Sequence, residues 1–390
     1  CAKISEGCEH CYAATMSGRN PNLLGRWGRY GTRIVASADM WKQPLKWNEW
    51  ARKSRVFQGE AWKQWGESST VGVPESRRIL AGIRGATREF TPEEWTALPP
   101  FRPRVFCASL ADVFEDWTGM MHFYEVDDEQ KPAIGCAWYV PSLGVVPAGK
   151  TSYHYSKNER QAKFQDVREQ TFALIEKTPH LDWMLLTKRP ENVMRMVPES
   201  WRAGFPANVW MGSTAENQKR FDERMPHLLS IPAKVRFLSC EPLLGALNFW
   251  PPVPGQEGAM TSDWSPKGLM GIHWVIVGGE SGPNARPMHP EWARSLRDQC
   301  VSAGVPFFFK QWGEWVELNA GPPPHDVVSM DDEAGQVMAT ACDGFISLTG
   351  DFVRDMASAA TDEPYRGLER VGKKAAGRLL DGRTWDEVPK

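Results

Sequence analysis

Three cysteines stand close together at the start of the printed sequence, and their spacing is its strongest sign of chemistry. Six residues separate Cys1 from Cys8, and Cys11 follows after two more. A Cys-x-x-Cys pair can hold one metal centre from a single turn, and Gly7 gives the loop the backbone freedom that this needs. An odd number of clustered cysteines argues against a disulfide framework. We therefore predict one metal centre bound by these three thiolates.

Two kinds of metal centre fit this ligand set. A structural zinc site needs four ligands, which the three thiolates and His10 would supply. A [4Fe–4S] cluster held by three thiolates leaves one iron open to a small molecule, as radical chemistry with S-adenosylmethionine (SAM) requires. The spacing favours the iron–sulfur cluster over zinc, with unrelated thiols as a third reading. Cysteines inside apolar stretches, such as Cys107 and Cys240, are expected to be small buried side chains.

Six short apolar runs are expected to form the strands that position this chemistry. They lack a clean alternation of apolar and polar residues, which is typical of parallel strands buried on both faces. Helical patterns lie between them, so the chain has the alternation of a parallel α/β barrel or a doubly wound sheet. The expected strands are 104–109, 181–187, 208–213, 235–240, 272–278 and 306–310, and the expected helices are 161–177, 189–196, 217–229 and 290–303.

Polar residues follow every expected strand. In parallel α/β folds the carboxyl ends of the strands carry the active site, so six polar ends favour one shared site at a barrel mouth. We expect these residues to bind a cofactor or substrate. The candidates are Ser109, Asp112, Lys188, Ser213, Thr214, Glu216, Glu241, Gly278 and Glu280.

Each candidate type suits a particular ligand group. A carboxylate such as Asp112 or Glu241 could accept hydrogen bonds from an ammonium group, and Lys188 could hold a carboxylate or phosphate. Gly278 would let backbone approach a ligand closely. The plainer alternatives are local: Asp112 complements a helix dipole, and a serine or threonine such as Ser213 caps the next helix.

A separate segment alternates basic residues with aromatic residues and glycines. Such a pattern suits the backbone and stacked bases of a nucleic acid, although a solvated loop is the alternative. The formal net charge of −2 provides no global basic field, so any nucleic-acid contact must come from a local patch. The candidate nucleic-acid residues are Arg26, Trp27, Arg29, Tyr30 and Arg33.

The pattern divides the chain into a main domain and an extension. Residues 1–317 are expected to form the barrel, with insertions at about 53–100 and 119–160, and residues 318–390 a C-terminal extension. A basic run at 371–382 predicts a short helix stopped by glycine. No apolar run approaches the roughly 18 residues that span a bilayer, and no signal peptide is recognised. We expect a cytoplasmic protein without membrane contact; its oligomeric state stays open.

Several motifs together resemble the "three-Cys-motif" family of phages and bacteria, which is similar to the radical SAM superfamily. The similarity covers nearly the whole chain apart from the two insertions. The motifs are Gly7-Cys8-Glu9-His10-Cys11, Leu186-Thr187-Lys188-Arg189-Pro190, Gly212-Ser213-Thr214, Ser239-Cys240-Glu241-Pro242, Val277-Gly278-Gly279-Glu280, Phe309-Lys310-Gln311-Trp312-Gly313 and Gly372-Lys373-Lys374-Ala375-Ala376-Gly377-Arg378.

The resemblance implies a partial (β/α) TIM-type barrel that holds a [4Fe–4S] cluster and SAM. Cys1, Cys8 and Cys11 would ligate three irons, and the amino and carboxylate groups of SAM would chelate the fourth. A reductant protein would supply the electron that cleaves SAM to methionine and a 5′-deoxyadenosyl radical. The first cysteine gap is six residues here and three in the superfamily. The superfamily's first barrel strand precedes the cysteine loop, so it would either lie upstream of Cys1 or be absent from this barrel.

The resemblance to a phage family also implies a substrate class. We expect an isomerase or base-modifying enzyme that acts on a thymine-derived base in phage DNA. The alternatives are a radical SAM enzyme acting on tRNA or a small metabolite, and a non-catalytic nucleic-acid-binding protein stabilised by a metal. The binding protein predicts zinc or a redox-silent cluster and salt-dependent DNA binding.

Overall fold

A computed structural model describes most of the chain. The residues described are 3–19, 34–35, 38–56, 102–107, 112–118, 120–125, 156–249, 269, 271–318, 343–354, 358 and 364–389. Cys1, Ser109 and the five candidate nucleic-acid residues at 26–33 lie outside this part, as does most of the expected insertion at 53–100.

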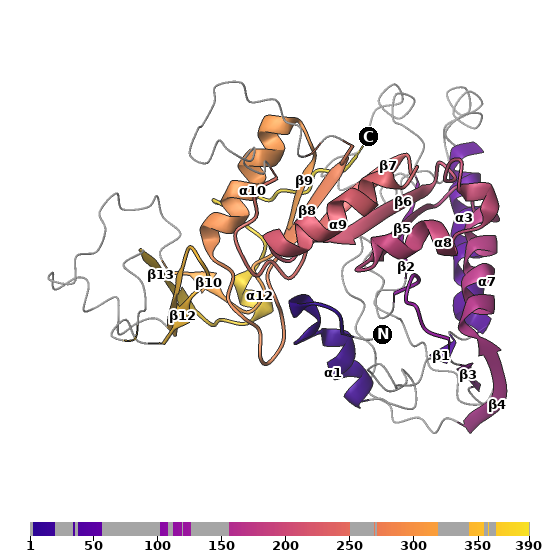
Figure 1. The fold of residues 1–390 in the computed structure, drawn as a ribbon, viewed down its shortest axis with the longest axis horizontal. Helices are drawn as coiled ribbons and strands as arrows, with labels where there is room; N and C mark the ends of the chain where they lie inside the picture. Colours follow the sequence, from indigo (N-terminus) through magenta and orange to yellow (C-terminus); the bar gives the residue numbers. More distant parts are fainter. Residues whose placement is uncertain are drawn as a thin grey trace, which may run out of the picture.

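One curled sheet of six parallel strands, a half barrel, forms the centre of the molecule (Figure 1). All six expected strands are confirmed. Each neighbouring pair is parallel, and the spatial order of the strands follows the sequence. The strands are β2 (Arg104–Cys107), β5 (Asp182–Thr187), β6 (Val209–Thr214), β7 (Val235–Cys240), β8 (Trp274–Gly278) and β9 (Phe307–Gln311).

The four expected helices are also present, with ends that the sequence explains. Asn217 caps α9 by accepting the Arg220 N–H at 3.0 Å. Pro290 opens α10, and Gly304 ends it with a left-handed φ of 64°. The bounds are α7 (Phe164–Glu176), the turn η4 (Pro190–Asn192) with α8 (Val193–Met196), α9 (Gln218–Ser230) and α10 (Pro290–Ala303).

Alternate side chains divide each strand between two cores. One set, including Leu185, Met211 and Val275, packs with residues of the helices in the main core. The other set lies on the inner, concave face of the sheet and forms a second core of Met184, Trp210, Phe237, Trp274, Ile276 and Phe308. This aromatic layer fills the half barrel below its carboxyl edge, so polar groups can gather only above it.

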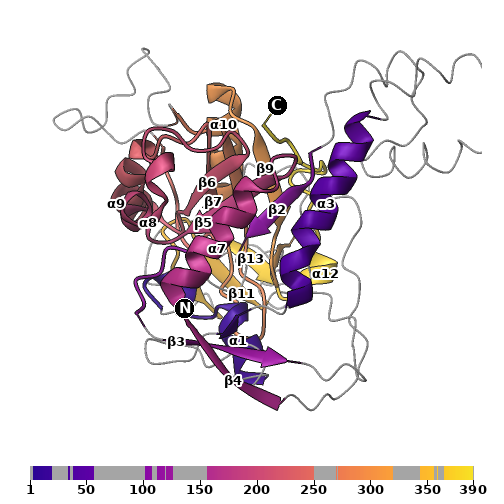
Figure 2. The same ribbon diagram turned by 90° about the vertical axis from the view of Figure 1, so that its right-hand side faces the viewer.

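The remaining elements flank the half barrel (Figure 2). The chain begins with η1 (Glu6–Cys8) and α1 (Tyr12–Arg19), and α3 (Ala38–Val56) is a long helix. One small sheet contains β1 (Ile34–Val35), β3 (Met120–Glu125) and β4 (Ser156–Lys163). A second contains β10 (Val316–Glu317), β11 (Gly344–Ser347), β12 (Phe352–Val353) and β13 (Tyr365–Glu369), followed by α12 (Lys373–Ala376).

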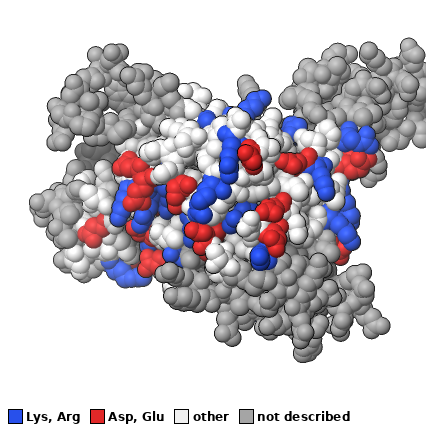
Figure 3. All heavy atoms as spheres, turned by 45° about the vertical axis from the view of Figure 1, so that its right-hand side comes forward, with Lys and Arg blue, Asp and Glu red and all other residues white. Residues whose placement is uncertain are grey.

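The predicted short basic helix is thus confirmed at α12, whereas the two small sheets were not expected. In the part that the structure describes, no helix has the length and apolar character needed to cross a membrane. Figure 3 shows Lys and Arg side chains intermixed with Asp and Glu on the face that it draws. That face carries no large region of one charge.

Candidate functional site

The cysteine motif folds as one tight turn. Ser5 precedes η1, and the Cys8 N–H donates to its carbonyl at 2.9 Å. Cys8 is only 4% exposed and Cys11 is half-buried, so both residues are shielded from solvent to some degree. The Ser5 hydroxyl lies 3.7 Å from the Cys8 Sγ.

Glu216, just beyond the carboxyl end of β6, is the first anchor of this turn. It is fully buried, and its Oε1 accepts hydrogen bonds from the Ser5 hydroxyl at 2.6 Å and the Lys188 ammonium at 2.5 Å. Its Oε2 accepts from Arg224 at 2.5 Å and from Thr214 at 3.4 Å. A carboxylate has about four acceptor positions, and here protein donors take them all.

The turn approaches Glu216 so closely that Gly7 is required there. A Cβ at Gly7 would clash with the Glu216 carboxylate. Burial alone would raise the pKa of Glu216, but the charges of Lys188 and Arg224 and the hydrogen bonds from Lys188 and Ser5 lower it to about 2. Glu216 is therefore a charged, buried anchor.

Glu280, after β8, is the second anchor. Its Oε2 meets the His10 Nδ1 at 3.2 Å, and its two oxygens accept from Arg286 at 2.7 and 2.9 Å. Arg286 in turn donates to the Glu6 carbonyl at 2.9 Å and to Glu9 at 3.0 Å. Burial raises the pKa of Glu280, and the hydrogen bonds and charge of Arg286 more than offset this, so the net pKa is lowered.

A third contact completes the docking of the turn. Arg220 on α9 holds both carboxylate oxygens of Glu6, at 2.8 and 3.0 Å. The cysteine turn is therefore fixed to the ends of β6 and β8 and to α9. In both ribbon views α1, which follows the turn, lies beyond the same end of the sheet as α12 (Figure 1).

Glu241, after β7, differs from the two anchors in what it accepts. The Ser239 hydroxyl donates to its Oε2 at 3.2 Å, and the Lys310 ammonium lies 3.0 Å from its Oε1. Lys310 belongs to β9, two strands away; the pair can form because Glu241 lies over Gly278 of the intervening strand, where a Cβ would be 2.7 Å from Oε1. Glu241 is 17% exposed and keeps acceptor positions for a ligand.

Asp112 lies at the end of β5, where its carboxylate accepts hydrogen bonds from other residues of the protein. Its carboxylate accepts from the Thr187 hydroxyl at 2.8 Å and the Arg189 guanidinium at 2.9 Å, and it is buried. The Phe114 N–H donates to it at 3.0 Å. These contacts hold the segment after β2 against the end of β5, so Asp112 is not the solvated helix-start residue of the plainer alternative.

The structure thus brings most of the predicted strand-end residues to one edge. Ser213 is fully buried, and its hydroxyl has no hydrogen-bond partner within the described part. By strand alternation it points away from Thr214, toward the helix layer. Neither of the two caps α9, because Asn217 does so.

Sequence reasoning missed the residues that hold the cysteine turn. No motif marks the residues Ser5, Glu6, Arg220, Arg224 and Arg286. Their partners in the site lie more than two hundred residues away or, for Arg224 and for the contact of Arg286 with Glu280, eight and six residues away. His10 was expected only as a possible zinc ligand. Its contact with Glu280 joins two residues that both belong to motifs of the sequence.

Donor chemistry separates the motif cysteines from the others. Burial raises the pKa of Cys107 to about 12, and it also raises the pKa of Cys240 and Cys300. Such thiols are poor metal ligands. Among the described residues no three His, Cys, Asp or Glu side chains gather as a metal site, and Cys1 lies outside them. Cys8 and Cys11 are therefore the described thiols that could hold a metal centre.

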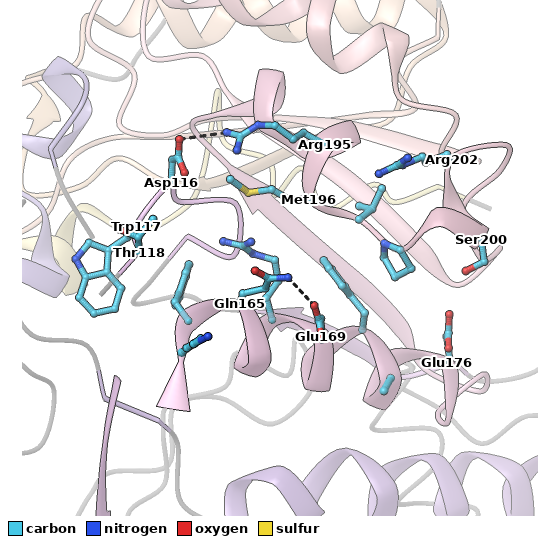
Figure 4. A pocket seen from close by; sticks show the side chains of 17 residues that line it. Asp116, Trp117, Thr118, Gln165, Glu169, Glu176, Arg195, Met196, Ser200 and Arg202 are labelled. Atoms are coloured by element: carbon cyan, nitrogen blue, oxygen red, sulfur yellow. Dashed lines mark hydrogen bonds and ion pairs between the residues drawn. The ribbon is translucent and has the colours of Figure 1, made fainter. Parts of the chain in front are cut away.

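A hollow of about 930 Å³ lies elsewhere, between α7 and the segment 193–202 (Figure 4). The Asp116–Arg195 ion pair, at 3.2 Å, lies on one side of it, and Glu169 and Arg202 also line it. Its charges are mixed. None of the predicted site residues lines it.

Comparison with known proteins gives one finding. A family model described as "Protein of unknown function (DUF5131)" matches residues 1–129 and 159–389. No curated protein and no solved structure matches the chain. The matched segments contain the cysteine turn, all six strands of the half barrel and α12. The chain therefore belongs to the DUF5131 family.

Proposed function

We propose that this protein is a radical SAM enzyme whose half barrel is the partial TIM-type barrel of that superfamily. The observation that carries the proposal is the docking of the Cys8–Cys11 turn on the carboxyl edge of a curled parallel sheet. Ligand sites of parallel α/β folds lie at this edge. A [4Fe–4S] cluster and SAM would supply, when bound, a 5′-deoxyadenosyl radical that abstracts hydrogen from an unactivated C–H bond.

The chain's own residues divide the remaining work. Cys8 and Cys11, together with Cys1, would hold the cluster. Glu216 and Glu280 are positioning residues, because their acceptor positions are taken by Ser5, His10 and basic side chains. They fix the turn and leave little capacity for a ligand.

Glu241 is the carboxylate that we assign to SAM. Among the described residues, its oxygens accept from Ser239 and Lys310, so each oxygen can accept a further hydrogen bond. An ammonium group next to a carboxylate forms a strong, charge-assisted hydrogen bond. Glu241 would therefore orient the amino group of SAM at the mouth.

For the substrate we retain a thymine-derived base in DNA. Acid–base groups cannot remove a proton from an unactivated carbon at neutral pH, so radical chemistry suits such a position. A base in a duplex would have to leave the stack to reach the edge of the sheet.

The test is an anaerobic assay of SAM cleavage. The protein is reconstituted with iron and sulfide, given SAM and a chemical reductant, and assayed for 5′-deoxyadenosine. We expect product from the wild type and from the matched variant Cys300→Ala, whose thiol is buried on α10. We expect none from the Cys8→Ala/Cys11→Ala double variant.

Other outcomes separate the alternatives. If tRNA or a small metabolite stimulates deoxyadenosine formation and DNA does not, the substrate belongs to that other class and is not a base in DNA. Bound zinc with no SAM cleavage would overturn the enzyme and favour the metal-stabilised nucleic-acid-binding protein.

A further inference from the structure

Arg378, two residues after α12, is a half-buried cation whose guanidinium has unused donors. Its Nε and Nη2 are buried and have no acceptor within the described part of the chain. Its guanidinium carbon lies 5.2 Å from the centre of the Phe308 ring, on the inner face of the sheet. A guanidinium stays charged at any physiological pH, and leaving its N–H groups buried without acceptors costs free energy. An anion from outside the chain would satisfy them.

The segment before Arg378 is fastened to the carboxyl edge of the half barrel. The Gly372 N–H donates to the Glu314 carbonyl at 3.0 Å, and the Trp312 N–H donates to the Gly377 carbonyl at 3.3 Å. The Trp312 indole also donates to the Leu379 carbonyl at 2.7 Å. Gly372 and Gly377 both have positive φ, at 85° and 69°, which permits the sharp turns at the two ends of α12. The α12 turn therefore has a fixed position beside β9.

Lys373 of α12 lies near Lys310. Partial desolvation lowers the pKa of Lys373 although its side chain reaches solvent, and the charge of the nearby Lys310 lowers it further. Neither Lys373 nor Lys374 forms an ion pair with a residue that the structure describes. The acids that face Lys373 are Glu241 and Glu314. Lys310, Lys373 and Arg378 thus share this end of the sheet with two carboxylates.

A β-bulge places Lys310 at this end. Val277 pairs with Phe309, but the next residue, Gly278, pairs with Gln311, so Lys310 is an extra residue in β9. Bulges re-aim side chains at the edges of sheets and next to active sites. Here the ammonium of Lys310 reaches Glu241 on the inner face, above Phe308 and the Arg378 guanidinium.

We propose that Arg378, Lys310 and Lys373 form a binding site for a phosphate group of the substrate. Arginine binds phosphate through paired N–H donors, and lysine adds point charges. The substrate would then be a phosphorylated nucleotide or a nucleic-acid strand, and not a free nucleoside or base. This choice of substrate rests on the function proposed above, whereas phosphate binding itself requires neither cluster nor SAM.

The test is a binding measurement on the full chain without SAM. Thymidine and thymidine 5′-monophosphate are titrated by calorimetry at low salt. We expect the monophosphate to bind at least about tenfold more tightly, in line with about 1.4 kcal/mol from the added charge contacts. Arg378→Gln and Lys373→Gln should each remove most of this preference. The control Lys177→Gln, exposed at the end of α7, should keep it.

A second variant and a second ligand keep the test decisive. Lys373 is exposed, so its substitution reports on the site even where Arg378→Gln fails to fold. A single-stranded thymidine oligonucleotide that loses affinity in the same variants identifies a nucleic-acid strand as the source of the phosphate. Binding of the monophosphate alone identifies a nucleotide.

Two results would contradict the phosphate site. Equal affinities for thymidine and its monophosphate would overturn the site, and so would a preference that survives both substitutions. Because no cluster is involved, such a result leaves the deoxyadenosine assay free to support the proposed function. Phosphate preference without deoxyadenosine would instead reject the function and keep the site.

Discussion

Three glutamates at the carboxyl edge show how partners decide the role of one residue type. Glu216 and Glu280 accept hydrogen bonds from several protein donors, which makes them anchors of the cysteine turn. Glu241 accepts from one hydroxyl and one ammonium and stays partly exposed. The same side chain is thus fully engaged by the protein at two strand ends, and at the third it keeps acceptor positions for the ligand that we propose.

Glu216→Gln tests the anchor directly. The substitution removes the charge that two cations face, the half-buried Lys188 and the buried Arg224. Breaking a buried ion pair from one side costs about 3–5 kcal/mol, and we expect a loss of that size in the free energy of unfolding. Urea denaturation followed by circular dichroism measures it. The exposed Glu169→Gln is the control and should change stability by less than about 0.5 kcal/mol. A similarly small change for Glu216→Gln would contradict the anchor.

Gly278→Ala tests the position of Glu241. The new methyl group would displace the Glu241 carboxylate and separate it from Lys310. If Glu241 orients SAM, we expect the Kd for SAM, measured by equilibrium dialysis on the reconstituted protein, to rise about tenfold, which corresponds to about 1.4 kcal/mol. Gly204→Ala, where a Cβ meets nothing within 4 Å, is the matched control. Equal SAM affinities for the two variants would show that Glu241 does not bind SAM.

At the scale of elements, the cysteine turn is a short segment held by distant strands and helices. The turn has few backbone hydrogen bonds of its own, and Arg286 links it to Glu280 after β8. A segment of this kind opens easily when its tertiary contacts are removed. Its position therefore depends on the elements around it.

Arg286→Gln should loosen the turn without unfolding the half barrel. Cys8 is almost fully buried, so its alkylation by iodoacetamide requires the turn to open. We expect the alkylation rate to rise about tenfold, as the loss of about 1.4 kcal/mol of contacts predicts. Mass spectrometry of the metal-free protein gives the rate, with the exposed Arg202→Gln as control. An unchanged rate at Cys8 would show that the other contacts suffice.

The central sheet was predictable because its strands are buried on both faces. Such strands leave uninterrupted apolar runs, and the helices between them keep clear start and stop signals such as Pro290 and Gly304. The long helix α3 was not predicted, since Pro44 lies inside it and its charged and tryptophan residues follow no clean apolar stripe. The small C-terminal sheet was missed because its strands are two to five residues long.

The site was predictable as a set of strand ends and not as a set of contacts. Parallel strands must bring their carboxyl ends to one edge, so Lys188, Thr214 and Glu216 were expected together, and they are. Which carboxylate meets which cation depends on side chains far apart in the sequence. The bulge at Lys310 illustrates this limit, because the residue pattern of β9 gives no sign of the extra residue.

At the scale of the whole molecule, the buried charges make stability depend on pH in acid. The pKa of Glu216 falls from 4.5 to about 2 on folding, so its contribution is complete above about 4.5 and is lost as the pH falls toward about 2. We expect the stability difference between the wild type and Glu216→Gln to be constant from pH 7 to pH 5 and to shrink below that. Urea midpoints at several pH values measure it. A difference that grows in acid would contradict the assignment.

The whole account depends on one placement: a half barrel with a cysteine turn docked on its carboxyl edge. The family match spans both parts. The most direct test of the central claim is the metal content of the reconstituted protein, combined with its electron paramagnetic resonance spectrum before and after SAM is added.

We predict about four irons and four sulfides per chain, as one [4Fe–4S] cluster requires, and a reduced-state signal that changes when SAM binds. The Cys8→Ala/Cys11→Ala variant should retain neither the iron nor the signal. Zinc without sulfide, or iron held equally well by the variant, would contradict the account.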